Sequence, residues 1–94
     1  MGAIAAGNCA IIKPSEVSAT SADIIFKLLP RYLDSNCYQV VNGDVEATKS
    51  LLKNKFDYLF ATGSPTVGRS ILQAAAPFLT PCTLELGGKR FFIK

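Results

Sequence analysis

The sequence predicts an α/β fold in which parallel strands alternate with helices. Three observations support this: mostly apolar runs of strand length, helical periodicity between those runs, and turn-forming residues at the boundaries. Apolar runs without alternation are typical of strands buried on both faces of a parallel sheet. Strands that alternate with helices over short loops favour right-handed crossovers. We therefore expect a parallel sheet flanked by helices, with no internal repeat or linker.

The first half of the chain is expected to contain two strands and three helical segments. In order, these are the end of a helix at 2–6, a strand at 9–12, a helix at 18–33, a strand at 38–41 and a helix at 45–53. Pro14 ends the first strand because it cannot donate to the ladder. Pro30 should kink the helix at 18–33 or split off its last turn. Asp44 is a suitable N-cap for the helix after it.

The second half begins with the pattern around which the functional prediction is built. Its expected elements are a strand at 58–61, a helix at 65–76, a strand at 82–86 and a possible fifth strand at 91–93. Ser64 is a good N-cap, and Pro65 suits the first helical position. Gly63 would let a ligand approach the backbone closely. Because the start of a helix offers free N–H groups and a positive dipole end, we expect a nucleotide phosphate to bind here.

Composition narrows the possible classes of protein. Of the 94 residues 49% are hydrophobic, which excludes a disordered tail and allows one small domain or part of a larger one. The net charge of +3 is spread along the chain, so a nucleic-acid partner is not expected. No apolar run approaches the roughly 20 residues that span a bilayer.

The cysteines also exclude one kind of site. Cys9, Cys37 and Cys82 are widely spaced and the chain has no histidine, so we expect no metal site. An odd cysteine count without a signal peptide favours a reducing interior. We expect all three to be small buried residues rather than nucleophiles.

The segment GSPTVGRS at 63–70 differs by one residue from the P-loop pattern G-x-x-x-x-G-K-[ST]. Two features argue against a nucleoside triphosphatase. Arg69 replaces the lysine that reaches the β- and γ-phosphates, and Pro65 removes one of the N–H groups that would cradle them. A plain structural turn remains the alternative to a phosphate site.

Two charged residues follow the first strand, at the sheet edge where open α/β folds bind ligands. The ammonium of Lys13 and the carboxylate of Glu16 are three residues apart and could both reach ribose hydroxyls. A carboxylate there would also repel a 2′-phosphate. The alternative is two solvated charges in a loop that leads into a helix.

Glu85 lies between Leu84 and Leu86 in an otherwise apolar strand. Such a carboxylate either faces solvent by simple alternation or is buried with a raised pKa, which would suit a general base. Cys82 is three residues earlier, so on a strand it faces the opposite side and does not pair with Glu85.

Taken together, these motifs resemble the aldehyde dehydrogenase superfamily, and most closely its class 3, fatty-aldehyde type. The resemblance covers about residues 2–89. It rests on five segments that occur in the family's order and spacing: AIAAGN at 3–8, KPSE at 13–16, ATGS with VG at 61–64 and 67–68, TP at 80–81, and LELGGK at 84–89.

The resemblance implies a role for each matching residue. Lys13 and Glu16 correspond to residues that hold the adenosine ribose, and Glu85 to the general base that activates water for thioester hydrolysis. Leu86 and Gly87 correspond to the backbone that lines the nicotinamide. The loop and helix where the pyrophosphate lies correspond to Gly63, Ser64, Pro65, Thr66, Val67 and Gly68.

The same resemblance implies a parent enzyme, namely an oxidoreductase that oxidises aldehydes to carboxylates with NAD or NADP. Residues 1–94 would be a slice of its Rossmann-like cofactor domain, and the parent would be a homodimer that is cytoplasmic or attached to the endoplasmic reticulum membrane. The nucleophilic cysteine and the oligomerisation region find no match here. We therefore expect the chain alone to be inactive, or to act as a non-catalytic nucleotide-binding or subunit-interaction fragment.

Overall fold

The structure is a computed structural model that describes residues 2–87, and the chain divides into two compact units after Lys49. Each unit contains one pair of parallel strands joined through a helix. The predicted α/β class with parallel strands is therefore confirmed. Within the described residues the strands hydrogen-bond as two separate pairs, one in each unit.

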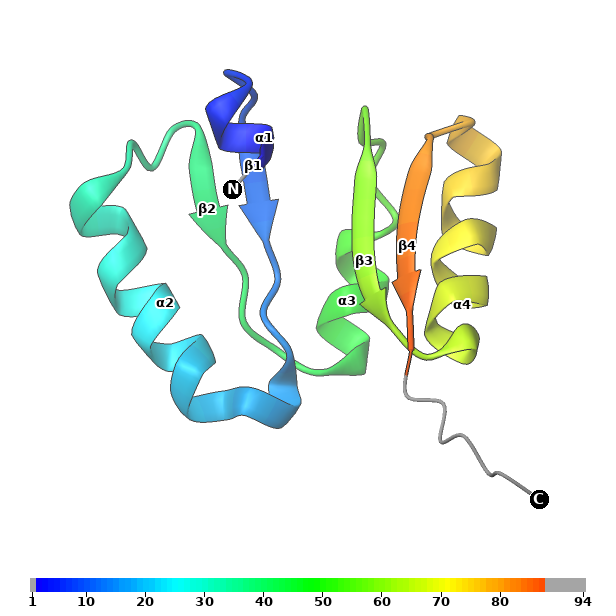
Figure 1. Cartoon of the computed structure of the whole chain (residues 1–94), viewed down its shortest axis with the longest axis horizontal. Helices are drawn as coiled ribbons and strands as arrows, with labels where there is room; N and C mark the ends of the chain where they lie inside the picture. Colours follow the sequence, from blue (N-terminus) through cyan, green and yellow to red (C-terminus); the bar gives the residue numbers. More distant parts are fainter. Residues whose placement is uncertain (1, 88–94) are drawn as a thin grey trace. The chain divides into compact units, whose positions relative to one another are not determined.

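The first unit is built around β1 (Ala10–Ile12) and β2 (Tyr38–Val40). The two strands pair in parallel, from Ala10 opposite Tyr38 to Ile12 opposite Val40. The short helix α1 (Gly2–Ala5) precedes β1, and α2 (Ala19–Tyr32) packs against β2 (Figure 1). A single 3₁₀ turn, η1 (Glu16–Ser18), leads into α2.

The second unit repeats this arrangement with longer strands. β3 (Leu59–Gly63) and β4 (Cys82–Leu86) pair in parallel along their whole length. Between them, α4 (Pro65–Ala75) packs against both strands (Figure 1) and continues into a 3₁₀ turn, η2 (Ala76–Phe78). The chain passes from the first unit into the second through α3 (Val45–Leu51), whose N–H groups at Glu46 and Ala47 donate to the Asp44 carboxylate as predicted.

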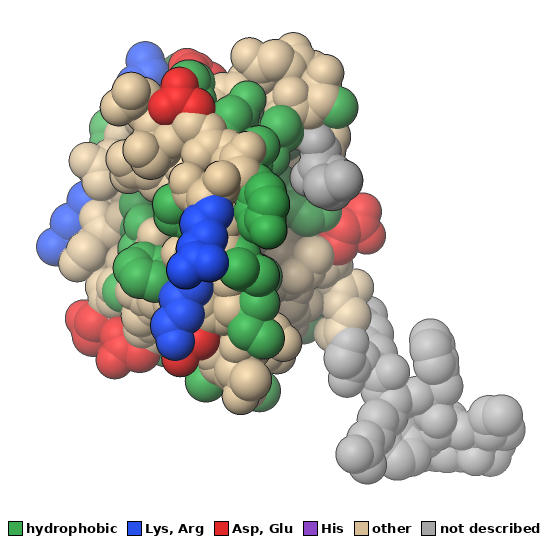
Figure 2. Space-filling model, turned by 90° about the vertical axis from the view of Figure 1, so that its left-hand side faces the viewer, with side chains coloured by type: hydrophobic (Ala, Val, Ile, Leu, Met, Phe, Trp, Pro, Cys, Tyr) green, Lys and Arg blue, Asp and Glu red, His purple; other side chains and the backbone are tan. Residues whose placement is uncertain are grey.

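The buried hydrophobic residues are few and small. Among residues 2–87 they are Ala22 on α2 and Ile71 and Ala75 on α4. Large apolar side chains of α2 that the periodicity marks as one face are instead exposed: Ile24, Ile25, Leu28 and Tyr32. Figure 2 views the side that carries α2, where green hydrophobic side chains share the surface with lysine and arginine. A two-stranded sheet offers too little area to cover the face of a 14-residue helix.

One buried hydroxyl fastens the loops at the start of β3 and β4. Thr80, only 9% exposed, donates its hydroxyl to the Phe56 carbonyl at 2.8 Å, and its N–H donates to the Ala75 carbonyl. The preceding residue, Leu79, adopts a left-handed conformation with φ 54° to make this turn. The loop after α4 is thereby joined to the residues just before β3.

Several sequence predictions need correction. α2 begins later than predicted, and Pro30 does not split it, since the helix continues to Tyr32. Pro30 stands in the last turn, where only one internal hydrogen bond is lost. Cys9 is exposed and Cys37 and Cys82 are half-buried, so the expected burial of all three is wrong. The possible strand at 91–93 lies outside the described residues.

No helix within residues 2–87 is both long enough and apolar enough to cross a membrane.

Candidate functional site

The carboxyl ends of β3 and β4 meet at an open pocket of about 450 Å³ in the second unit. Its lining residues come from the end of each strand and from the residue that follows: Thr62, Gly63, Ser64, Glu85 and Gly87. Thr62 stands directly opposite Glu85 in the strand register, and the Gly87 N–H donates to the Gly63 carbonyl at 3.0 Å. The ladder therefore holds Glu85 beside the turn that starts α4.

That turn has the predicted form of a capped helix start. Ser64 has an extended backbone, and its hydroxyl accepts a hydrogen bond from the Val67 N–H at 3.3 Å. Pro65 occupies the first helical position, where it has no N–H to leave unpaired. The next amide, Thr66 N–H, has no acceptor within residues 2–87. An anion at this end of α4 would meet that N–H and the positive end of the helix dipole.

Gly63 and Gly68 affect the geometry of this turn in different ways. Gly63 has φ +157°, and a Cβ placed there would lie 3.3 Å from Val67 Cγ1, so the turn favours glycine. Gly68 is buried, and its missing Cβ leaves room for the Leu86 side chain, 3.0 Å from the position a Cβ would take. Gly63 lines the pocket, whereas Gly68 brings α4 close to β4 and positions the site indirectly.

Glu85 and Leu86 end β4 with exposed side chains. Of the two alternatives for Glu85, exposure agrees with the solvent-facing one in this chain. Cys82, three residues earlier on the same strand, faces the other side of β4, and its thiol contacts the Thr80 carbonyl at 3.5 Å.

Lys13 and Glu16 form the charged part of a second site, which lies in the first unit. The Lys13 ammonium is 3.5 Å from Glu16 Oε2 and donates to the Pro14 carbonyl at 2.8 Å. The Lys13 side chain is only 14% exposed, whereas that of Glu16 is 48% exposed. Lys13 is therefore fixed by its neighbours, and the Glu16 carboxylate remains accessible.

A smaller pocket of about 180 Å³ adjoins Glu16. Four of the residues that line it were not predicted from the sequence as site residues, namely Ser15, Asp23, Asn42 and Gly43. The Asn42 Oδ1 atom is buried and has no hydrogen-bond partner among the described residues. A buried acceptor without a donor is costly, so this end of β2 carries an unmet polar group. The only sequence signal was that Asn42-Gly43 ends β2.

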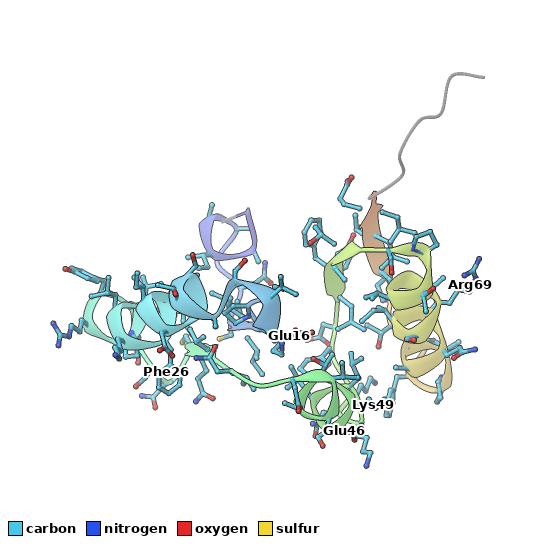
Figure 3. The ribbon with its side chains drawn as sticks, turned by 90° about the horizontal axis from the view of Figure 1, so that it is seen from below. Glu16, Phe26, Glu46, Lys49 and Arg69 are labelled. Carbon is cyan, nitrogen blue, oxygen red and sulfur yellow. The ribbon has the colours of Figure 1, made fainter. Side chains whose placement is uncertain are left out.

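The predicted site residues thus fall into two groups. Lys13 and Glu16 lie together in the first unit, and the others lie at the carboxyl ends of β3 and β4 in the second. Arg69, which stands where the P-loop pattern has lysine, is exposed and points away from β3 and β4 (Figure 3).

Comparison with known proteins places these observations in context. A family model described as "Aldehyde dehydrogenase family" matches residues 1–93. Among curated proteins, aldehyde dehydrogenase family 3 member A2 of Macaca fascicularis is 60% identical over 95% of this chain and 18% of its own length. Member B2 of family 3 from Mus musculus is 56% identical over 95% of this chain and 19% of its own. The resemblance predicted from the motifs, including its class 3 character, is confirmed.

Solved structures agree with the sequence relatives. A substrate-bound Staphylococcus aureus AldH aligns with a TM-score of 0.89 and 50% identity, over 94% of this chain and 19% of that one. A Mycobacterium tuberculosis aldehyde dehydrogenase complexed with NAD+ aligns with a TM-score of 0.71 and 36% identity, over 84% of this chain and 17% of that one. The chain therefore spans somewhat less than a fifth of the length of these relatives.

Proposed function

The chain belongs to the aldehyde dehydrogenase family, and on that premise we propose that its two sites hold the two ends of a dinucleotide, NAD or NADP. The observation that carries the proposal is the start of α4. There a capped helix, a glycine turn and the Glu85 carboxylate share one pocket. The bound nicotinamide would supply the hydride acceptor for aldehyde oxidation.

The start of α4 would bind the pyrophosphate. Thr66 N–H is available to an anion, and the Val67 N–H can be shared with the Ser64 hydroxyl that already accepts from it. Gly63 removes the side chain that would block close approach of the backbone. Gly68, which the family resemblance places among the cofactor contacts, would act here by holding α4 against Leu86.

The Lys13–Glu16 pair would bind the adenosine ribose. A carboxylate accepts hydrogen bonds from vicinal hydroxyls, and Glu16 is the exposed member of the pair. Lys13 holds that carboxylate in place from its largely buried position. Asn42, which lines the adjacent pocket, would lie beside the same part of the ligand. A carboxylate here favours NAD over NADP, because it repels a 2′-phosphate.

Glu85 would serve as the general base. Its carboxylate lies in the pocket at the carboxyl ends of β3 and β4, where it can take a proton from water that attacks a thioester. The backbone of Leu86 and Gly87 would line the nicotinamide next to it. The nucleophilic thiol would come from outside these residues, since Cys82 faces away from Glu85 and none of the three cysteines matches the family's nucleophile motif. The 94-residue chain would then bind a dinucleotide without oxidising aldehydes.

For the parent enzyme we propose oxidation of aldehydes, fatty aldehydes included, to carboxylates. We further propose that it is a homodimer without a nucleic-acid partner, located in the cytoplasm or attached to the endoplasmic reticulum membrane. The similarity to family 3 members supports the substrate class. A subunit-interaction role is the alternative for the chain itself, and the exposed apolar residues of α2 favour it.

Calorimetric titration of the 94-residue chain with NAD tests the dinucleotide proposal. Lys13→Met should weaken binding about tenfold, equal to about 1.4 kcal/mol, and Glu16→Gln should raise the affinity for NADP relative to NAD. The chain offers a matched control: Glu46 and Lys49 on α3 also form an ion pair three residues apart, at 3.4 Å, but with both side chains well exposed (Figure 3). Lys49→Met should leave NAD affinity unchanged. Equal losses in the two variants would show that only general charge matters and would refute the ribose assignment.

A further inference from the structure

Two of the three cysteines stand side by side at the start of the first sheet. Cys9 and Cys37 immediately precede the first register pair of β1 and β2, Ala10 opposite Tyr38. The Ala10 N–H donates to the Cys37 carbonyl at 2.9 Å, so the two cysteines lie beside each other where the strand pair begins. Neighbouring residues of paired parallel strands project to the same face, so the two thiols share one side of the sheet.

The distance between paired strands suits a covalent link. Adjacent strands lie about 4.7–4.9 Å apart, which falls within the Cα separations of about 4.4–6.8 Å seen in disulfides. The pKa of Cys37 is raised, first by a side-chain hydrogen bond with Cys9 and next by the charge of the Cys9 thiolate, which agrees with the adjacency that the strand register gives. Burial and the charge of Asp34 act in the same direction.

The two thiols differ in accessibility. Cys9 is exposed, while Cys37 is half-buried and faces the negative charge of Asp34. An oxidant from solvent therefore meets Cys9 first, and Cys37 is the neighbour that can react with the oxidised sulfur. Cys82 lies in the second unit, on β4, where its thiol contacts the Thr80 carbonyl.

We propose that Cys9 and Cys37 form a modification site, a dithiol that a peroxide converts into a disulfide between β1 and β2. The Cys9 thiolate attacks one peroxide oxygen, so that an S–O bond forms, the O–O bond breaks and hydroxide leaves. The Cys37 sulfur then loses its proton and attacks the Cys9 sulfur, which forms the S–S bond and releases a second hydroxide. The two thiols lose two electrons and hydrogen peroxide is reduced to two molecules of water.

The disulfide would join the strand that leads to Lys13 with the strand that leads to Asn42. Both residues belong to the ligand site of the first unit. The disulfide closes a loop that contains η1 and all of α2. It should therefore lower the conformational entropy of the unfolded chain. Oxidation would therefore stabilise the first unit and leave the pairing of β3 with β4 unchanged.

The test is peroxide treatment of the reduced 94-residue chain, followed by intact mass and tryptic mapping without reductant. The chain should lose about 2 Da and keep one free thiol, on Cys82. The tryptic peptide 1–27 should be linked to peptide 32–49, because Lys13 is followed by proline and is not a cleavage site. Cys82→Ser should form the same link, whereas Cys9→Ser and Cys37→Ser should not lose the 2 Da.

Repetition in urea separates folded geometry from chance. In the unfolded chain the links should be distributed over all three cysteines, and the preference for the 9–37 link should fall to the modest one that its shorter loop gives. Three results would overturn the proposal: a dominant link to Cys82, dimers joined through Cys9, or sulfinic acid at Cys9 with Cys37 still free in the folded chain.

Discussion

The connections from β3 to α4 and from β1 to α2 both lead from a strand to a helix, and they present different chemical groups. β3 passes into α4 within one residue, and Ser64 caps the helix directly. β1 reaches α2 only after Lys13-Pro14-Ser15 and the 3₁₀ turn η1, and the Ser18 side chain makes no cap hydrogen bond. The turn from β3 to α4 thus presents backbone N–H groups, whereas the connection from β1 to α2 presents an ion pair.

This difference suits two different parts of a ligand. Backbone amides and a helix dipole attract an anion whatever the shape of that anion. A carboxylate held by a buried lysine accepts hydrogen bonds from hydroxyls and repels phosphate. A dinucleotide carries both kinds of group, which is why we propose it as the ligand whose ribose and pyrophosphate these two turns bind. The comparison can be tested by changing each turn separately.

The largest effect is expected from the glycines that border the pockets. At Gly43 in the first unit, φ is +149° and an added Cβ would lie 2.4 Å from Ala47 Cβ, whereas at Gly63 the nearest atom would be 3.3 Å away. Gly43→Ala should therefore lower the free energy of unfolding by about 2–3 kcal/mol, and Gly63→Ala by about 1 kcal/mol. Hydrogen exchange of the β1–β2 and β3–β4 amides measures each unit by itself.

Gly87→Ala is the control for these variants, since a Cβ at Gly87 meets nothing within 4 Å. It should change exchange rates in neither unit. An equal loss in Gly43→Ala and Gly63→Ala would mean that the turn after β2 relaxes around the added methyl group.

The next effect concerns the two serine caps. Ser64→Ala removes the acceptor for Val67 N–H at the start of an 11-residue helix and should cost about 1 kcal/mol. Ser15→Ala removes the corresponding bond to Val17 N–H from a single exposed 3₁₀ turn and should cost about 0.5 kcal/mol or less. Thermal unfolding followed by circular dichroism measures both.

Ser64→Asp sharpens the comparison further. Aspartate is as good an N-cap as serine, so stability should be retained. Its negative charge would nevertheless stand where the pyrophosphate is proposed to bind, so NAD affinity should fall at least tenfold. If both stability and NAD affinity are retained, the anion does not bind at the start of α4.

The parts of the fold that local chemistry determines could be predicted from the sequence. The strand Cys82–Leu86 and the start of α4 at Pro65 are as predicted, because a proline-glycine boundary and a serine cap leave few alternatives. Lys13 and Glu16 were predicted to lie together at the end of the first strand, but the ion pair between them was not predicted. The family resemblance supplied their roles, which local chemistry alone left open.

The remaining features depend on long-range packing. Whether Ile24 and Leu28 on α2 are covered depends on how much sheet lies beneath them, which helical periodicity does not report. The pairing of Cys9 with Cys37 depends on the register of β1 with β2, and the unpaired Asn42 Oδ1 depends on how the end of β2 packs. Side chains brought together by register carry no signal in the spacing of one sequence.

The smallest expected effect again distinguishes the two units, through their thiols. The pKa of Cys37 in the folded chain is raised above its ordinary value of 9.0, chiefly by the hydrogen bond with Cys9. Near and above that value the unfolded chain loses this proton more readily than the folded one, so stability should fall as the pH rises through about 9. Cys37→Ser should flatten this decline, and Cys82→Ser, which alters a thiol of the other unit, is the matched control. Lysine and tyrosine titrations are common to all three chains, so they cancel when the unfolding midpoints are subtracted.

Parallel curves for Cys37→Ser and the unaltered chain would show that the two thiols of the first unit do not interact in solution, and would remove the basis for the disulfide between β1 and β2.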